Sequence, residues 1–217
     1  MPHSGKGRME GGTVTVDGLD TSETSVGNLS RTVGFVFQDP DHQIVSNEVD
    51  SELAFGPEQS GVDADIIEKR ITHVSGMLSM EHLRGGREVA ELSWGGERQK
   101  VAIASVLMMQ PKVIVLDEPL SGLDTGSAAT LLDSLATIGR RWNIAVVIVE
   151  HRLDLLVGFM DRVVVMNDGG IVYDGVLPEN PAETTIPHLK DMGDLLDAAG
   201  TFSPEPYAPA RRRISDP

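Results

Sequence analysis

The chain has 217 residues, of which 40% are hydrophobic and 24% charged, a composition typical of a globular protein with one large domain or two small ones. It contains no apolar run long enough to span a membrane and no secretory leader, so we expect a cytosolic protein. The absence of cysteine excludes disulfides and thiolate metal sites. A formal net charge of −15 disfavours nucleic acid as a partner.

The first half of the chain is predicted to contain two short strands followed by helices. Residues 13–16 and 33–37 are rich in β-branched and aromatic residues and read as strands, the first ending at the turn Asp17-Gly18. A helix over 63–80 is predicted to begin at Asp65, with Glu68 completing a capping box. Its apolar side consists of Ile66, Ile67, Ile71, Val74 and Leu78. The segment between Gln38 and Leu92 is therefore expected to be mainly helical.

The second half of the chain has the pattern of a parallel sheet. Residues 113–116 and 144–149 are continuous apolar strands, and residues 127–141 between them predict a helix. Such a strand–helix–strand unit is typical of an α/β domain whose sheet is covered on both faces. A hairpin over 163–173 turns at Asp168-Gly169-Gly170. The tail from Thr201, with several prolines and three consecutive arginines, has no apolar period and is expected to be disordered.

The acidic pair Asp117-Glu118 directly follows the apolar strand 113–116. Ligands of open α/β sheets bind beyond the carboxyl ends of the strands, and carboxylates at that edge suit Mg²⁺ bound to a phosphate chain. The alternative is that the pair, followed by Pro119, only ends the strand and begins a loop. Either reading puts these carboxylates at the edge of a predicted parallel sheet.

Five elements follow one another along the chain: Val33–Gln38, continued to Pro57; Leu92–Glu97; Val113–Glu118; Ser121–Asp124; and Glu150–Asp154. Together they resemble the nucleotide-binding subunits of ABC transporters, and among these the energy-coupling-factor type associated with cobalt, nickel and vitamin uptake. The resemblance spans about Thr13 to Gly175. By this resemblance the five elements are, in chain order, the strand and glutamine of the Q-loop, the signature motif, the Walker B strand, the D-loop and the segment with the switch histidine.

The resemblance implies a P-loop NTPase-like parallel sheet core of the ABC ATPase type, with a helical subdomain at about 39–92, and a site that hydrolyses ATP with Mg²⁺. Asp117 then serves the metal through water, and Glu118 is the general base. Gln38 contacts both the metal shell and the attacking water. His151 donates to the γ-phosphate. The other histidines, His3, His42, His73, His82 and His188, are expected to be solvated loop residues.

The signature stretch is predicted to lie at the amino end of a helix that starts near Glu97. Free amides and the positive helix dipole make such an end an anion site, and Gly95 and Gly96 let the backbone approach a phosphate. By resemblance, that phosphate belongs to the ATP of a second subunit. Ser93 is the predicted hydroxyl, although Trp94 separates it from the two glycines. Ser121 and Asp124 are assigned to the same nucleotide site, with Asp124 bridging the two subunits.

A phosphate-binding Walker A loop is not found upstream of the first predicted strand. Ser4-Gly5-Lys6-Gly7 is a partial match, but no strand precedes it and no hydroxyl follows the lysine. The chain is therefore interpreted as truncated at its amino end, and as written it should hold ATP poorly in its own site. This leaves two interpretations: a complete ATPase whose recorded start is too late, or a truncated subunit that lends its signature face to a complete partner.

A DNA-repair or chromosome-type ATPase is a third hypothesis, which the acidic surface and the stretch from Gln38 to Pro57 disfavour. The preferred prediction is an ATP-binding and hydrolysing subunit that couples ATP hydrolysis to uptake of a metal ion or vitamin. Its expected partners are an integral membrane transporter subunit and a second nucleotide-binding subunit, with no nucleic acid. We expect it to be peripheral on the cytoplasmic face of the membrane, with an ATP-binding domain over 1–200 and a tail over 201–217. Phe55, Gly56 and Pro57 are candidate contacts to the membrane partner.

Overall fold

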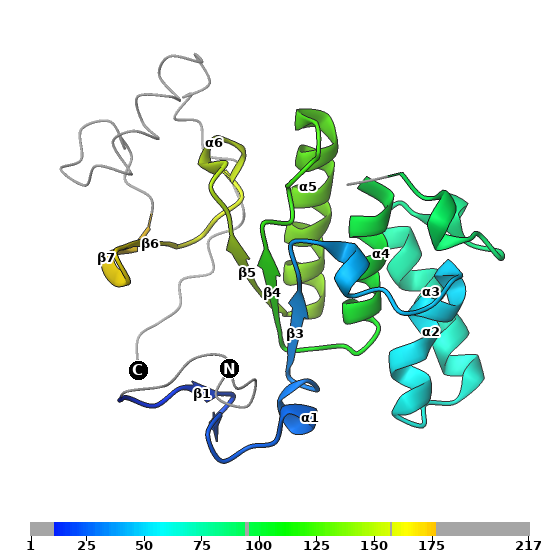
Figure 1. Cartoon of the computed structure of the whole chain (residues 1–217), viewed down its shortest axis with the longest axis horizontal. Coiled ribbons are helices and arrows are strands. Elements are labelled where there is room, and N and C mark those ends of the chain that lie inside the picture. Colours follow the sequence, from blue (N-terminus) through cyan, green and yellow to red (C-terminus); the bar gives the residue numbers. More distant parts are fainter. Residues whose placement is uncertain (1–10, 94–95, 157, 177–217) are drawn as a thin grey trace. The chain divides into compact units, whose positions relative to one another are not determined.

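The computed structural model describes residues 11–93, 96–156 and 158–176 (Figure 1). The chain divides into two compact units, Met1–His151 and Arg152–Pro217, and each is described by itself. Three features predicted from the sequence lie outside the described residues: the Ser4–Gly7 segment, the Trp94-Gly95 pair and the tail from Thr201. The predicted domain limits at 200 and 201 stay a prediction for the same reason.

The described part of the first unit alternates strands and helices. Its strands are β1 (Thr15–Val16), β2 (Leu19–Asp20), β3 (Val33–Val36), β4 (Val113–Asp117) and β5 (Ala145–Val149). Its helices are α1 (Val26–Leu29), α2 (Val49–Gln59), α3 (Ala64–Met77), α4 (Gly96–Leu107) and α5 (Thr125–Trp142), with the short 3-10 turns η2 (Pro40–His42), η3 (Glu81–Leu83) and η4 (Val89–Glu91). None of the helices in the described segments is both long enough and apolar enough to cross a membrane.

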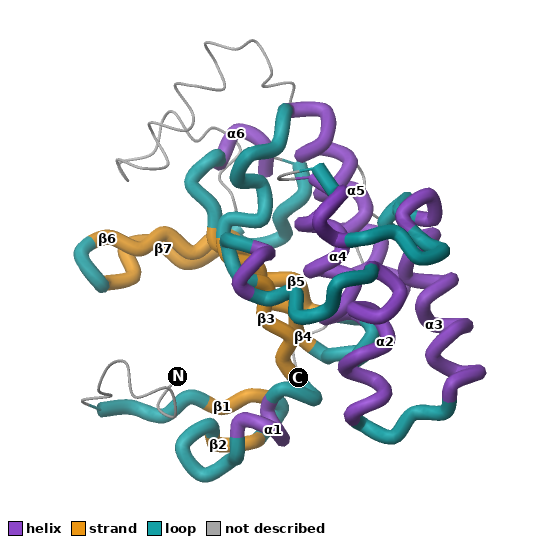
Figure 2. Tube along the Cα trace, turned by 45° about the vertical axis from the view of Figure 1, so that its right-hand side comes forward, coloured by secondary structure: helices purple, strands orange, loops and turns teal. Residues whose placement is uncertain are grey.

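A parallel sheet in the order β3-β4-β5 forms the centre of this unit (Figure 2). Its register sets Gly34 beside Ile114 and Ile114 beside Val146, so these three residues share one face. That face is covered by α4, whose Val106 lies against Gly34, and by α5, whose Gly139 lies against Val146. The residues buried between the sheet and these helices form the core: Val36, Ile114, Leu116, Val101, Ile103, Ala104, Leu107, Leu131, Leu132 and Leu135.

The prediction that both faces of the sheet are covered is wrong for β5. Val147 and Val149 point away from α5 and are 47% and 54% exposed. The sequence pattern records only that these residues are apolar, and it does not record which neighbours reach them. The α/β class and the parallel strand–helix–strand unit were predicted correctly.

The region between Gln38 and Leu92 is mainly helical, as predicted, but two local predictions are wrong. Helix α3 has Asp63 as its amino-terminal cap residue, without a side-chain capping bond, so Asp65 and Glu68 form no capping box. Pro57 is buried in α2, and a Cβ on Gly56 would lie 2.8 Å from Sδ of Met109, so both residues pack inward. Of the three candidate contacts, only Phe55 is exposed.

The second unit contains α6 (Leu153–Leu156) and a hairpin of β6 (Val163–Asn167) and β7 (Gly170–Gly175). The hairpin matches the prediction over 163–173. Arg162 joins its two ends, because the guanidinium lies 2.6 Å from Asp174 Oδ1.

Gly34 of β3 lies directly against α4. A Cβ at this position would lie 2.1 Å from Cγ1 of Val106, a distance that no real Cβ tolerates. We expect Gly34→Ala to lower the free energy of unfolding by about 1–3 kcal/mol through overpacking. Val106→Ala should relieve the clash. The double variant should therefore lose less free energy of unfolding than the two single variants lose in sum. Denaturant unfolding of the four proteins measures this coupling, and strictly additive losses would contradict it.

Candidate functional site

Three predicted catalytic residues follow three neighbouring strands of the sheet. Gln38 comes shortly after β3, Glu118 directly after β4 and His151 shortly after β5. The strands are parallel and in register, with Val36 beside Leu116 and Asp117 beside Val149, so their carboxyl ends meet at one edge. Residues far apart in sequence are thereby brought to a single place.

Glu118 is the centre of this group. Its Oε2 accepts a hydrogen bond of 2.9 Å from Nε2 of Gln38. Its Oε1 lies 3.7 Å from Nδ1 of His151. The side chain of Glu118 is 33% exposed and that of His151 is 70% exposed, so both can reach a ligand from solvent. The structure thus places two of the predicted catalytic side chains, Gln38 and His151, beside the third, Glu118.

Asp117 is the last residue of β4 and is half-buried beside this group. Among the described residues, no group of three or more His, Asp or Glu side chains could hold a metal ion alone. Magnesium commonly takes only one or two protein carboxylates, together with water and substrate phosphates. The carboxylate oxygens of Asp117 and the amide oxygen of Gln38 are ligands that Mg²⁺ prefers, so these two residues fit an ion that arrives with a phosphate chain.

The backbone at Glu118 has an unusual conformation. Its φ is +45°, in the left-handed region, and the next residue is Pro119. Residues before proline favour extended backbone, so this conformation is strained and needs support from its surroundings. Part of that support is a hydrogen bond of 2.9 Å from the N–H of Glu118 to the carbonyl of Val149. The loop continues with the N–H of Ser121 donating to the carbonyl of Glu118 at 3.0 Å.

The end of this loop is fixed by Asp124, the amino-terminal cap of α5. Its carboxylate accepts from the N–H groups of Gly126 and Ser127 at 2.9 and 3.0 Å and from the Ser127 hydroxyl at 2.6 Å. The loop between Glu118 and Asp124 is therefore held at both ends. Ser121, which the resemblance assigns to the nucleotide site, is exposed within it.

The Asp124 cap predicts a pH-dependent stability. Hydrogen bonds from the Ser127 hydroxyl and the Ser127 N–H hold the pKa of Asp124 below its ordinary value of 3.8. A carboxyl group whose pKa is lower in the folded than in the unfolded protein stabilises the fold at pH values above the unfolded-state pKa. This stabilisation is lost as the pH falls through the folded-state pKa. We expect Asp124→Ala to lower Tm at neutral pH, and the difference from the parent to shrink in acid. Thermal unfolding across pH tests this. An equal difference at every pH would exclude a role for the ionised cap.

The signature residues form a second group, at the start of α4. The helix begins at Gly96, and Oε2 of Glu97 accepts from the N–H of Ser93 at 2.8 Å. This hydrogen bond is the main reason why the pKa of Glu97 lies below its ordinary value. A Cβ on Gly96 would lie 3.9 Å from Cδ2 of Leu123, so the start of α4 is adjacent to the loop after Glu118. Gly95 lies outside the described residues.

The sequence-based prediction missed a set of residues that tie the segment after β3 to α4. Gln43 accepts from the N–H of Phe37 at 3.1 Å and donates to the carbonyl of Ala102 at 3.2 Å. Asp41 forms an ion pair with Arg98 of α4 at 2.8 Å. The only sequence signal was the cluster of polar residues directly after Gln38, which also fits a solvated loop.

Glu150 was also missed as a site residue. Its side chain is fully buried and lies 3.6 Å from Nδ1 of His151. The available signal was an acidic residue between an apolar strand and the predicted switch histidine. That signal is weak, because acidic residues are common in loops.

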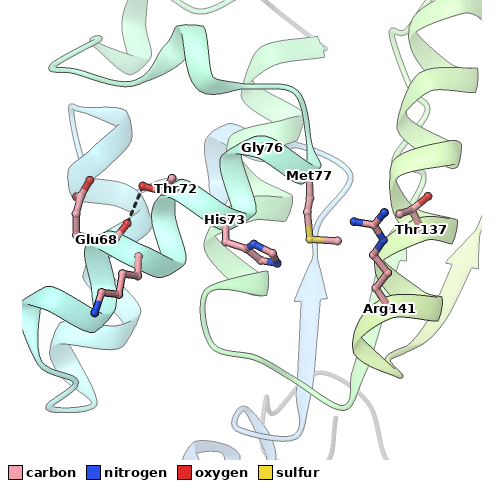
Figure 3. Close-up of a pocket in the computed structure, with 8 residues that line it drawn as sticks. Glu68, Thr72, His73, Gly76, Met77, Thr137 and Arg141 are labelled. Atoms are coloured by element: carbon pink, nitrogen blue, oxygen red, sulfur yellow. Dashed lines mark hydrogen bonds between the residues drawn. The ribbon is translucent and has the colours of Figure 1, made fainter.

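Two of the histidines expected to be solvated loop residues, His73 and His82, are exposed as predicted but also have partners in the fold. His73 lies in α3, where its ring stacks on Trp142 of α5 at 5.6 Å, and it lines a cavity of about 670 Å³ between the two helices (Figure 3). His82 lies 3.4 Å from Glu97. His42 is exposed, as predicted, with Asp39 nearby, while His3 and His188 lie outside the described residues.

The chain is similar in sequence and in fold to known proteins. The sequence model of the family described as "ABC transporter" matches residues 4–121. The energy-coupling factor transporter ATP-binding protein EcfA1 of Clostridium novyi is 34% identical over 185 residues, which are 84% of this chain and 64% of that protein. The solved structure of cbiO1 from Clostridium perfringens, described as part of the ABC transporter complex cbiONQ, is 30% identical with a TM-score of 0.75 and covers 90% of this chain and 80% of its own.

A second solved structure, an ATP-binding cassette in its ADP conformation, is 24% identical with a TM-score of 0.67 and covers 89% of this chain and 77% of its own. It shares the fold, and the predicted fold class is therefore confirmed. The chain spans only 27% and 33% of the length of two relatives from Methanosarcina acetivorans and Methanosarcina mazei, which are 38% and 33% identical to it over 80% and 95% of its length. The match of the family model to more than half of the chain, together with the shared fold, shows that this protein belongs to the ABC transporter family.

Proposed function

We propose that this chain is the ATP-hydrolysing subunit of an energy-coupling-factor type transporter, and that it drives uptake of a metal ion or vitamin through a membrane partner. The observation that carries this proposal is the contact of Gln38 and His151 with Glu118 at the carboxyl edge of the sheet. The names of EcfA1 and cbiO1, two similar proteins, support the transporter type. The choice of solute would belong to the membrane subunits.

The residues at the sheet edge have the chemistry that ATP hydrolysis needs. Glu118 would accept the proton of the attacking water, and the amide of Gln38 would hold that water and the carboxylate in line. Asp117 would bind the Mg²⁺ that accompanies the phosphates, through water. His151, exposed beside Glu118, would donate to the γ-phosphate as its negative charge develops.

The signature group would serve the nucleotide of a second nucleotide-binding subunit. Helix α4 is long enough to have a substantial dipole, and the N–H groups of its first turn, which include those of Gly96 and Glu97, have no acceptor within the helix. Ser93, Gly95, Gly96 and Glu97 would contact that phosphate, and Ser121 and Asp124 would lie where the two subunits meet. The adjacency of Gly96 and Leu123 supports one continuous surface for this contact.

The membrane partner would dock on the segment between β3 and α2. A cavity of about 420 Å³ lies there, lined by Asp41, Ile44, Val45, Ser46, Asn47, Glu88, Val89, Ala90 and Arg98. Two apolar side chains are available for such a contact, since Val45 is 66% exposed and Phe55 of α2 is 46% exposed. The buried carboxylate of Glu52 holds this segment by accepting from the N–H groups of Val45 and Ser46 at 2.9 Å each. Docking of this kind would make the protein peripheral on the cytoplasmic face of the membrane.

The proposal is tested on the protein purified in mild detergent from its native cells. We expect a membrane protein to co-purify, and the complex to release inorganic phosphate from ATP in the presence of Mg²⁺. Val45→Asp should break the co-purification because it adds a charge to the apolar surface. A protein that is isolated without a membrane subunit and has no phosphate release would show the proposed function to be wrong.

A further inference from the structure

Glu150 is a buried carboxylate that contacts both the loop after Glu118 and His151. Its side chain has no exposure to solvent, whereas Glu118 and His151 beside it are both accessible. We propose that Glu150 is a positioning residue for ATP hydrolysis, which holds Glu118 and His151 in their relative places without contacting the nucleotide. This inference rests on the proposed function.

One oxygen of Glu150 supports the strained backbone at Glu118. Its Oε1 accepts from the N–H of Leu120 at 3.2 Å. On the other side of Pro119, the N–H of Glu118 donates to the carbonyl of Val149 at 2.9 Å. The Glu118-Pro119 pair is thus held from both sides by two consecutive residues, Val149 and Glu150. A left-handed residue before proline is strained, so its conformation persists only with such anchors.

The other oxygen of Glu150 supports His151. Its Oε2 accepts from the N–H of His151 at 2.9 Å and lies 3.6 Å from Nδ1 of the same residue. Oε1 of Glu118 lies 3.7 Å from this Nδ1. The ring is therefore turned with Nδ1 toward two carboxylates, which leaves its opposite edge directed away from them. One side chain thus sets both the position of Glu118 and the orientation of His151.

The chemical requirement is specific to a carboxylate. Each oxygen of Glu150 accepts from a backbone donor, Oε1 from the N–H of Leu120 and Oε2 from the N–H of His151. A glutamine has one acceptor oxygen and one donor NH₂, so it must set a donor against a donor on one of the two sides. Glu150→Gln therefore keeps the volume of the side chain and disturbs the alignment of Glu118 or His151.

The decisive experiment is steady-state ATP hydrolysis by the assembled complex carrying Glu150→Gln. We expect kcat to fall about tenfold or more and KM for ATP to change less than about twofold, because the displaced groups act in the transition state rather than in ground-state binding. Asp50→Asn is the matched control. Asp50 likewise accepts a backbone N–H, from Gly85 at 2.8 Å, and lies 3.2 Å from the Arg84 guanidinium, but it belongs to α2. This control should leave kcat within about twofold of the parent.

A Glu150→Gln complex with parental kcat would overturn the inference, and so would equal falls in kcat for Glu150→Gln and Asp50→Asn. Hydrogen exchange provides a second readout that needs no hydrolysis. In Glu150→Asp, whose shorter side chain cannot reach both donors, we expect the Leu120 amide to exchange at least about tenfold faster than in the parent. Unchanged exchange there would also overturn the inference. A parent complex that hydrolyses no ATP would instead contradict the proposed function, and the exchange measurement would then decide on Glu150.

Discussion

Glu118→Gln is expected to lower kcat for ATP hydrolysis by about two to four orders of magnitude while nucleotide binding is retained. Glutamine has the shape of glutamate and can still accept the hydrogen bond that Gln38 donates to Glu118 at 2.9 Å. It cannot accept a proton from water at neutral pH, so the loss falls on the chemical step. The variant should therefore separate binding from hydrolysis.

The measurement is phosphate release by the assembled complex, together with ATP binding to the same preparation. Asp133→Asn is the matched control, because it removes an exposed carboxylate on the surface of α5 and should leave both quantities unchanged. Parental turnover in Glu118→Gln would remove Glu118 from the role of general base. Loss of binding together with turnover would indicate that Glu118 holds the nucleotide or its metal rather than the water.

The core of the fold was predictable because its signals are local. The continuous apolar stretches around Ile114 and Val147 are typical of parallel strands, and Asp124 has the residue type and position of a helix cap, although α5 begins two residues before the predicted 127. Local signals failed where a distant residue decides the outcome. The ring of His73 stacks on Trp142, and no pattern around residue 73 contains that information.

The sequence predicted which residues belong to the candidate site, but not how their side chains are arranged in space. Gln38, Glu118 and His151 were singled out by their resemblance to known motifs, and the parallel register explains why they meet. Glu150 depends instead on the path of the backbone after Glu118, which is left-handed at a non-glycine residue. A non-glycine residue with positive φ before proline is disfavoured locally, so sequence rules argue against the conformation that the site uses.

Contacts of the segment after β3 connect the candidate site to helix α4. Gln43 bridges the N–H of Phe37 and the carbonyl of Ala102, and Asp41 pairs with Arg98. Gln38, which contacts Glu118, lies between Phe37 and Asp41. These contacts join the residues on either side of Gln38 to α4, and the Asp41–Arg98 pair also borders the proposed docking cavity.

His151→Ala is expected to lower kcat by about two to three orders of magnitude, the usual effect of removing one donor to a developing negative charge. Because Nδ1 of His151 lies 3.7 Å from Oε1 of Glu118, the two residues should act as a unit. The double variant with Glu118→Gln should then be only a few-fold slower than the slower single variant, since residues that act together lose most of their effect at the first substitution.

Four complexes measure this coupling: the parent, the two single variants and the double variant, each assayed for kcat at saturating ATP. His73→Phe is the matched control. It removes an imidazole far from the site while an aromatic ring still stacks on Trp142, so kcat should stay at the parental value. If the two single losses instead multiply in the double variant, His151 and Glu118 act independently. The distance of 3.7 Å between His151 and Glu118 would then reflect proximity without a shared role in the reaction. In that case the positioning role of Glu150 would concern Glu118 alone.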